Sequence, residues 1–186
     1  VYDKFVAFRE SLGMEVLPAT GGVSRFGVLA QRLRAGHLVC LLADRDVTGT
    51  GIEVEFFGEK ARMMGGPAAL AVQTGAALMP VTLWYEGACW GAHIHEEIPV
   101  PGHGTRQEQI AAMTQQLAAV FERAITAHPQ DWHMLQRVFM GDLDQARLAA
   151  SAAKADAAAD APAGGQPRAP GNAGGQPGAP GRGSGA

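Results

Sequence analysis

Apolar residues recur at helical spacing in two segments near the start of the chain. The first, YDKFVAFRESLG, predicts an amphipathic helix that ends at Gly13 and is followed by a short strand at 14–17. The second predicts a helix that begins around 20–22 and runs to about Ala35, where Gly36 is placed to cap it. Its expected buried stripe consists of Val23, Phe26, Ala30 and Leu33.

A continuous apolar run follows at Leu38–Ala43. This pattern is typical of a strand covered on both faces, as in a parallel sheet between helices, and it predicts that Cys40 is a small buried side chain. Asp44, Arg45 and Asp46 come directly after the run. Ligands of open α/β sheets bind at the carboxyl ends of strands, so this loop is a candidate site.

The next segment, 52–57, alternates between apolar and acidic residues. Alternation with a period of two predicts a strand that places Glu53 and Glu55 on one face and Val54 and Phe56 on the other. Two carboxylates on one face are either solvated or directed into a polar cleft. Gly58 is expected to end the strand.

A glycine-rich helix start lies just beyond this strand. Lys60 and Arg62 precede Gly65 and Gly66, and a helix is expected from Pro67 to a capping glycine at position 75. Free N–H groups next to cations can bind a phosphate. Glycines that allow close packing explain the same pattern, and the sequence leaves both interpretations open.

Two further strands are expected at 77–85 and 89–94, joined by a turn at Glu86 and Gly87. His93 and His95 alternate onto one face beside two glutamates. That pair suggests a metal site, but no third ligand at a defined spacing accompanies it, so we do not predict a metal.

The strongest helical pattern runs from Thr105 to about His128 and ends before Pro129. Its expected core stripe consists of Ile110, Met113, Leu117, Val120, Phe121 and Ile125. The segment 131–140 predicts a second short helix or turn, with Trp132 and Phe139 docked on the core.

Composition narrows the function classes. With 186 residues, 47% hydrophobic and 18% charged, the chain predicts one domain with a substantial core. The net charge of -3 gives no general signal for nucleic-acid binding. Two widely separated cysteines indicate no disulfide framework and a cytosolic compartment, and no apolar run is long enough for a membrane span.

The end of the chain has a different composition. We assign 1–141 to a folded domain, 142–160 to a charged alanine-rich segment and 161–186 to a disordered tail. The tail repeats GGQPRAPG as GGQPGAPG and contains no apolar side chain larger than proline, so burial cannot offset its ordering entropy.

Several pieces of the folded part occur in a characteristic order. They are FRESLGMEV, GG-x2-R before LRAGH, LLADRD, GIEVEFFGEKARMMGGPAALAVQTGAALMPV and HPQDWHMLQRVF. Together they resemble the lipid A biosynthesis acyltransferase family, and most closely its actinobacterial branch, over about residues 1–141. The resemblance implies an α/β fold like that of glycerolipid acyltransferases, with a central, mostly parallel sheet flanked by helices.

The resemblance also implies a chemistry. The family transfers a fatty acyl group, in this branch from acyl-CoA, to a hydroxyl, here on the mannose of a phosphatidylinositol mannoside. A histidine in an H-x4-acid motif is the base, and a downstream glutamate, Glu53 or Glu55, supports it. The cations expected to suit CoA phosphates or a lipid head group are Arg25, Lys60 and Arg62. The candidate substrate-binding residues in full are Arg25, Asp44, Arg45, Lys60, Arg62 and Glu86.

Acyl-CoA is then a co-substrate, and no cofactor or metal is expected. The second partner is a membrane glycolipid, which implies peripheral attachment at the cytoplasmic face of the cell membrane.

The chain differs from the family pattern in its H-x4-acid base motif. Among six histidines only His103 satisfies H-x4-acid, with Glu108 as the acid. Thr105 and Glu108 form a T-x-x-E capping box, which explains that acid structurally, and the family motif precedes the GG-x2-R helix. We therefore expect the base motif to lie before Val1, so that this chain is the carboxyl-terminal part of an acyltransferase domain and is inactive or unstable alone.

Two other interpretations remain open. One is a different α/β domain that binds a phosphate ligand at 44–46. The other is a non-enzymatic binding module whose Gly/Pro-rich tail tethers partners.

Overall fold

The computed structural model describes residues 1–17, 25–46 and 49–143. Within these ranges the chain is a mixed α/β protein with two separate two-stranded antiparallel sheets. The helices are α1 (Tyr2–Ser11), α2 (Arg25–Arg34), α3 (Gly66–Thr74) and α4 (Arg106–Ala127), with the short 3-10 helices η1 (Pro129–Asp131) and η2 (Met140–Asp142). The strands are β1 (Ile52–Phe56), β2 (Glu59–Met63), β3 (Val81–Glu86) and β4 (Cys89–Ile94).

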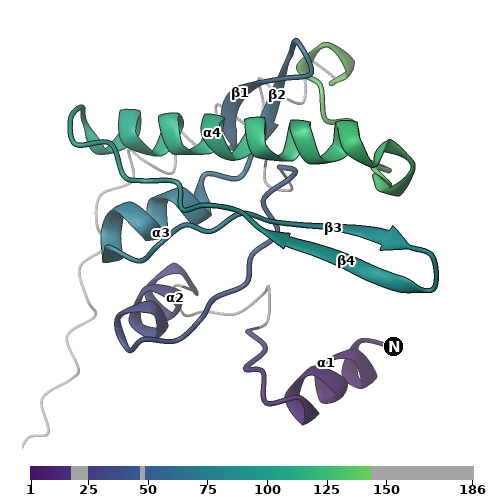
Figure 1. Cartoon of the computed structure of the whole chain (residues 1–186). Coiled ribbons are helices and arrows are strands. Elements are labelled where there is room, and N and C mark those ends of the chain that lie inside the picture. The colour runs from purple at the N-terminus through teal and green to yellow at the C-terminus, as the bar shows by residue number, and fades with distance from the viewer. Residues whose placement is uncertain (18–24, 47–48, 144–186) are drawn as a thin grey trace, which may run out of the picture.

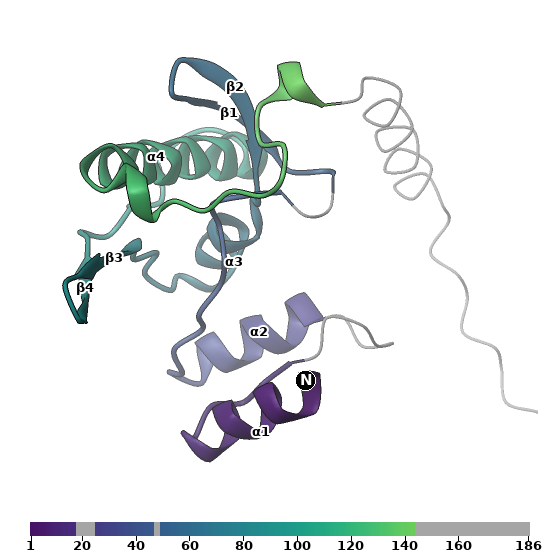
Figure 2. The same ribbon diagram turned by 90° about the vertical axis from the view of Figure 1, so that its right-hand side faces the viewer.

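Helix α4 lies in the middle of the molecule. The β1–β2 hairpin covers one side of it, and α3 lies on the other side together with the β3–β4 hairpin (Figures 1 and 2). Helix α2 packs on α3, and α1 lies beyond α2, farthest from the β1–β2 hairpin (Figure 2). The order of layers is therefore β1–β2, α4, α3, α2 and α1.

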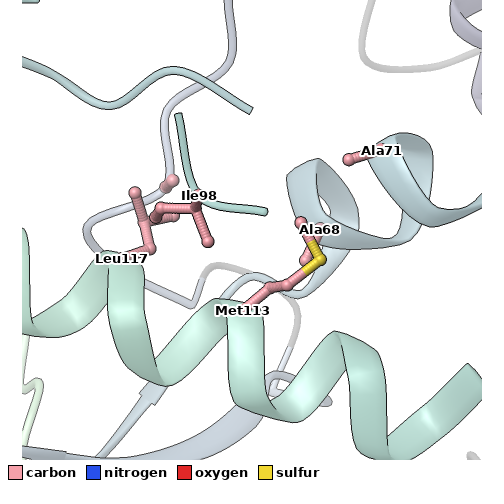
Figure 3. Close-up of a cluster of buried hydrophobic side chains, with 6 residues drawn as sticks. Ala68, Ala71, Ile98, Met113 and Leu117 are labelled. Carbon is pink, nitrogen blue, oxygen red and sulfur yellow. The ribbon is translucent and has the colours of Figure 1, made fainter. Parts of the chain in front are cut away.

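One core cluster lies between α4 and α3. Met113 and Leu117 project from α4 toward Ala68 of α3 and toward Ile98 (Figure 3), and all four side chains are buried. Ala43 closes the same cluster. Small residues on α3 let the two helices approach closely, so bulky side chains from α4 fill the gap between them.

The second core cluster lies between α4 and the β1–β2 hairpin. Val54 and Phe56 of β1 are buried together with Ala61 and Met63 of β2, and Ala118 is the α4 residue beneath them. The segment after α4 crosses the outer side of this cluster with the partly buried residues Trp132, Met134 and Phe139, next to the buried Val138. The predicted docking of Trp132 and Phe139 is confirmed.

Local sequence signals account for most element ends. Thr105 and Glu108 form the predicted capping box at the start of α4. Gly75 ends α3 with a φ of 73°, and Gly36 follows α2 with a φ of 81°, a left-handed conformation that glycine adopts without steric cost. The predicted α1, α3 and α4 and the strands β1, β3 and β4 are all present within one to four residues of their expected limits.

The predicted central parallel sheet is not present in the described ranges. Residues 38–43 form no strand, and Leu38 and Leu42 are 89% and 81% exposed. The short strand expected at 14–17 is also absent, and Cys40 is exposed rather than buried. The apolar pattern indicated burial, but a strand exists only through a hydrogen-bonded neighbour, and the described part of the chain supplies none beside these segments.

Strand β2 was not predicted. Phe57 and Gly58 both have positive φ, of 53° and 76°, as a two-residue hairpin turn requires, and Lys60 and Arg62 therefore lie in a strand rather than in a loop. Three predictions lie outside the described residues. They concern the expected helix start at 20–22 with Val23, nearly all of the segment 142–160 and the whole tail at 161–186.

The core position of Leu117 provides a test of this arrangement. We expect Leu117→Ala to lower the free energy of unfolding by about 2–5 kcal/mol, because Leu117 is only 2% exposed and its removal leaves a cavity between α4 and Ile98. The matched control is Leu135→Ala, at a position 98% exposed, which should change stability by less than about 0.5 kcal/mol. Urea denaturation followed by circular dichroism measures both, and equal effects of the two substitutions would contradict the core assignment.

Candidate active site

The β1–β2 hairpin carries a charged face. Glu53 lies opposite Arg62 and Glu55 lies opposite Lys60 in the strand register, so all four side chains project from the face away from Val54 and Phe56. Lys60 Nζ donates to Glu53 Oε1 at 2.6 Å. The hydrogen bond and charge of Lys60, with a smaller effect of Arg62, lower the pKa of Glu53 below its ordinary value.

Polar residues of α4 fix the position of this face. Gln115 forms two hydrogen bonds to the main chain of Glu55, accepting from its N–H at 2.8 Å and donating to its carbonyl at 2.9 Å. Glu122 accepts from the N–H of Phe57 at 2.8 Å. With Phe56 fully buried beneath, β1 is held on α4 at its edge and on one face.

The loop that follows residues 38–43 meets the same hairpin. The carboxylate of Asp46 accepts from the N–H groups of Gly49 and Gly51, at 3.1 and 2.7 Å. Arg62 donates to the carbonyl of Gly49 at 2.9 Å and so ties the loop to β2. A side chain at position 51 would meet the Asp46 carboxylate and the Met63 carbonyl at 2.6–2.8 Å, so only glycine fits there.

Asp44 and Arg45 form an ion pair on the other side of this loop, with Arg45 Nε 3.1 Å from Asp44 Oδ1. The hydrogen bond to Asp44 raises the pKa of Arg45. Both residues line a cavity of about 460 Å³ that extends between residues 41–45, β3 and the carboxyl-terminal half of α4. Its volume is in the range of small-molecule sites and its lining is mainly apolar.

The structure brings together six of the predicted site residues. Glu53, Glu55, Lys60 and Arg62 share the charged face, and Arg62 connects it to the loop that contains Asp44 and Arg45. Arg25 lies exposed at the start of α2, and Glu86 lies at the end of β3 next to the hairpin turn. Figures 1 and 2 place α2 on the far side of α4 from β1–β2, so the structure does not group Arg25 with the charged face, and the assigned roles stay predictions.

The glycines before α3 have a packing role. A Cβ atom at position 65 would lie 2.7 Å from Ile52 and 3.3 Å from Ile110, so Gly65 allows β1 and α4 to approach the start of α3. Position 66 is open. The packing interpretation therefore accounts for Gly65, and phosphate binding at this helix start stays a prediction.

The sequence contains two candidate histidine sites, the His103–Glu108 motif and the pair His93 and His95. Glu108 accepts from both the N–H and the hydroxyl of Thr105, at 2.7 and 2.9 Å, and these bonds lower its pKa, so it caps α4 as predicted. The rings of His93 and His95 stack at 4.3 Å, and His95 Nε2 lies 2.8 Å from Thr82 Oγ1. Across the described ranges, no group of three or more His, Cys, Asp or Glu side chains is placed to hold a metal ion.

Sequence reasoning missed Gln115 and Glu122. Both lie 60 or more residues from the main-chain groups that they bind, and nothing in the local sequence distinguishes them from other polar residues on α4. The alternation in β1 predicts a strand, but the helix that the strand lies against is a tertiary fact.

Comparison with known proteins shows which family the chain resembles. Residues 1–140 match the family model described as bacterial lipid A biosynthesis acyltransferase. The chain is 50% identical over 150 residues to a protein of Mycobacterium tuberculosis named phosphatidylinositol mannoside acyltransferase, and 48% identical over 150 residues to one of the same name from Mycolicibacterium smegmatis. These alignments cover 80% of this chain and 46% and 48% of the relatives, so the chain spans about half the length of the curated relatives that it matches. Among the helices of the described ranges, none is both long and apolar enough to cross a membrane.

The pairing of Glu53 with Lys60 gives a first prediction for this site. Replacing Lys60 with Gln removes the largest cause of the lowered pKa of Glu53, so that pKa should rise toward the ordinary value of about 4.3 while Arg62 maintains a small part of the shift. Carbon-detected NMR titration of the glutamate carboxylates measures it. Lys4→Gln on α1 is the control, and a Glu53 pKa that is the same in both variants would exclude the ion pair.

His95 gives a second prediction. Burial, and then repulsion from His93 and Arg123, lower its pKa, so the unfolded chain takes up a proton at a higher pH than the folded chain. Stability from this residue is therefore complete above about pH 6.5 and decreases as the pH falls from there toward the lower folded pKa. His95→Gln should reduce the slope of unfolding free energy against pH in that window by up to about 1.4 kcal/mol per pH unit, the limit for one proton. Denaturant unfolding at several pH values measures the slope, and an unchanged slope would contradict the assignment.

Proposed function

The chain belongs to the bacterial lipid A biosynthesis acyltransferase family, and we propose that it contributes to the transfer of a fatty acyl group from acyl-CoA to a hydroxyl of a glycolipid. The acceptor that we propose is the mannose of a phosphatidylinositol mannoside. The observation that carries the proposal is the identity of 48–50% over 150 residues to relatives with that name.

The charged face of β1–β2 has the chemistry for a supporting role in this reaction. A histidine base takes the proton of the acceptor hydroxyl, the oxygen attacks the thioester carbonyl, and the CoA sulfur leaves and receives the proton. A carboxylate beside the base stabilises the imidazolium that forms. Lys60 lowers the pKa of Glu53 and donates to its Oε1, and we assign Oε2 to the contact with the base.

The histidine base of this reaction is not part of the charged face. Among the described histidines, none is hydrogen-bonded to Glu53 or Glu55, and Glu108 is occupied in capping α4. We therefore propose that this chain contributes the supporting carboxylate and the cations of the active site, and not the base. We assign the histidine to a part of the family's domain that this chain does not match.

The cations on and near this face suit an anionic substrate. Lys60, Arg62 and Arg45 lie on the hairpin and on the loop tied to it, where they are positioned to attract the phosphates of CoA or of a lipid head group. A lipid acceptor and an acyl-CoA donor imply peripheral attachment at the cytoplasmic face of the membrane.

A chimaera tests the proposal. In the M. smegmatis relative, the matching region is replaced by residues 1–140 of this chain, and CoA release from palmitoyl-CoA is measured with and without a mannosylated phosphatidylinositol. We expect acceptor-dependent release. Removing the carboxylate that supports the base, by Glu53→Gln or Glu55→Gln, should lower kcat by up to about 10⁴-fold, the size of effect seen when a carboxylate that orients a histidine base is lost.

Glu59→Gln is the matched control, because it removes an exposed carboxylate from the same hairpin at its turn. It should leave the rate unchanged. A folded chimaera that releases no CoA above background, beside an active unmodified relative, would rule out the proposed function. Full activity in both the Glu53 and the Glu55 variants would rule out the role of the charged face.

A further inference from the structure

Two histidines and an arginine converge on a second cavity, which lies between the end of β4 and the middle of α4. Its volume is about 480 Å³, and none of the residues that line it belongs to the β1–β2 hairpin. His93 and His95 come from β4 and the position just after it, and Arg123 comes from α4. Ile98 and Val120, only 5% and 8% exposed, form an apolar floor beneath these three side chains.

The two imidazole rings are held in a fixed arrangement. They stack with ring centroids 4.3 Å apart and planes 12° from parallel. His95 is half-buried, and its Nε2 lies 2.8 Å from the hydroxyl of Thr82 on β3, which orients the ring. Within the described ranges, neither Nδ1 of His95 nor either ring nitrogen of His93 has a hydrogen-bond partner. These nitrogens are free to contact a ligand.

No carboxylate of the described residues neutralises this cluster. Arg123 is exposed and forms no ion pair there. Glu96 and Glu97 also line the cavity, but neither of them is ion-paired to the histidines or to the arginine. The guanidinium therefore lies beside two imidazoles without an acidic partner of its own.

The same three side chains border the 460 Å³ cavity on their other side, where the charged groups already have partners. Asp44 is paired with Arg45, and Asp131 accepts the N–H of Tyr85 at 2.9 Å. His128 stacks on an indole of β3. The acidic residues of that cavity are thus engaged elsewhere and leave the histidine–arginine cluster uncompensated.

The electrostatic environment of His95 is positive. Burial is the main cause of its lowered pKa, and repulsion from His93 and from Arg123 adds to the effect. Groups that repel one another when protonated are stabilised by an anion placed between them and destabilised further by a cation. The cluster therefore favours an anion over a metal ion.

We propose that His93, His95 and Arg123 form a binding site for a phosphate group, which the guanidinium and the two imidazoles contact together. Arginine offers several N–H donors in a planar fork that matches the oxygens of a phosphate, and a protonated imidazole adds a charged donor. Protonation of the histidines completes the site, so binding strengthens as the pH falls. The site contains no residue of the charged face and does not depend on acyl transfer.

The pH dependence follows from linkage. An anion in contact with the ring stabilises the protonated form of His95 and so raises its pKa, and protonation in turn strengthens anion binding. Without a ligand this pKa lies below the ordinary value of about 6.5, so the gain in affinity develops as the pH falls below that value. A rise of about one pKa unit corresponds to about ten-fold tighter binding to the protonated form.

Histidine titration by NMR tests the proposal. The full 186-residue chain is titrated from about pH 8 to about pH 4.5, across the histidine range, in sodium sulfate and in sodium chloride of equal ionic strength. Sulfate is the probe because its charge stays constant over this range. We expect sulfate to raise the pKa of His95 by about one unit and to leave that of His103, in an exposed loop, unchanged.

Substitutions on one helix make the test specific. Arg123→Gln should remove the sulfate-dependent rise at His95 and weaken sulfate binding at low pH by at least about ten-fold, the loss expected for a hydrogen bond to a charged group. Arg106→Gln is the matched control, because it removes an exposed arginine at the other end of α4, and it should preserve both effects. His93→Gln, at a second exposed position, should weaken binding as Arg123→Gln does. Circular dichroism should be unchanged in all three variants.

Two further probes identify the source of the phosphate group. Inorganic phosphate that shifts the His95 signals, without a preference of the chain for phosphatidylinositol in phosphatidylcholine vesicles, would assign the site to a soluble phosphate compound. Co-sedimentation that requires phosphatidylinositol and is lost in Arg123→Gln would assign it to a lipid head group. Equal shifts at His95 and His103, or a shift that survives Arg123→Gln, would indicate an adventitious ion only and would overturn the proposal, as would no response to any of the three anions.

Discussion

Burial of helix α4 on two sides is the interaction on which the described fold depends. Met113 and Leu117 on one side meet α3 and Ile98, while Ala118 on another side lies under β1 and β2. Phe121 contacts both clusters. In the described structure the β1–β2 hairpin and α3 lie on opposite sides of this helix (Figure 1), and they approach each other directly only where Ile52 lies beside Gly65. This helix has 22 residues and a reciprocal capping box at its start, so it is long enough to contact both layers and its first turn is stabilised.

The same helix determines the geometry of the candidate active site. The apolar face of β1 is buried against α4, so the charged face with Glu53, Glu55, Lys60 and Arg62 is presented outward on a rigid support. Gln115 and Glu122 then hold the edge of β1 and the turn after it. Glu53 is thus a carboxylate with a cation at 2.6 Å on a strand that α4 holds in place, which is the arrangement on which its proposed role rests.

The two hairpins differ in what covers them. Hairpin β1–β2 has an apolar face that α4 buries and a polar face for solvent or substrate, which is a balanced arrangement for a two-stranded sheet. Hairpin β3–β4 packs Trp84 inward but exposes apolar residues on its other face, which is an arrangement of marginal stability for an isolated hairpin. The two hairpins therefore differ in how much of their apolar surface the described structure buries.

The sequence by itself determined the elements whose signals are local. The capping box at Thr105, the glycines after α2 and α3 and the alternation in β1 specified element type and ends, because caps and periodicity depend on residues only a few positions apart. The ordered motifs also identified the family. Tertiary structure alone decided how strands pair and which faces are covered. The apolar run at 38–43 predicted a strand in a parallel sheet, yet a strand needs a neighbour, and its pairing is set by segments far away in the chain. The turn at Phe57 and Gly58 made Lys60 a cross-strand partner of Glu55 and an ion-pair partner of Glu53, and the long-range hydrogen bonds of Gln115 and Glu122 fixed that pair in place.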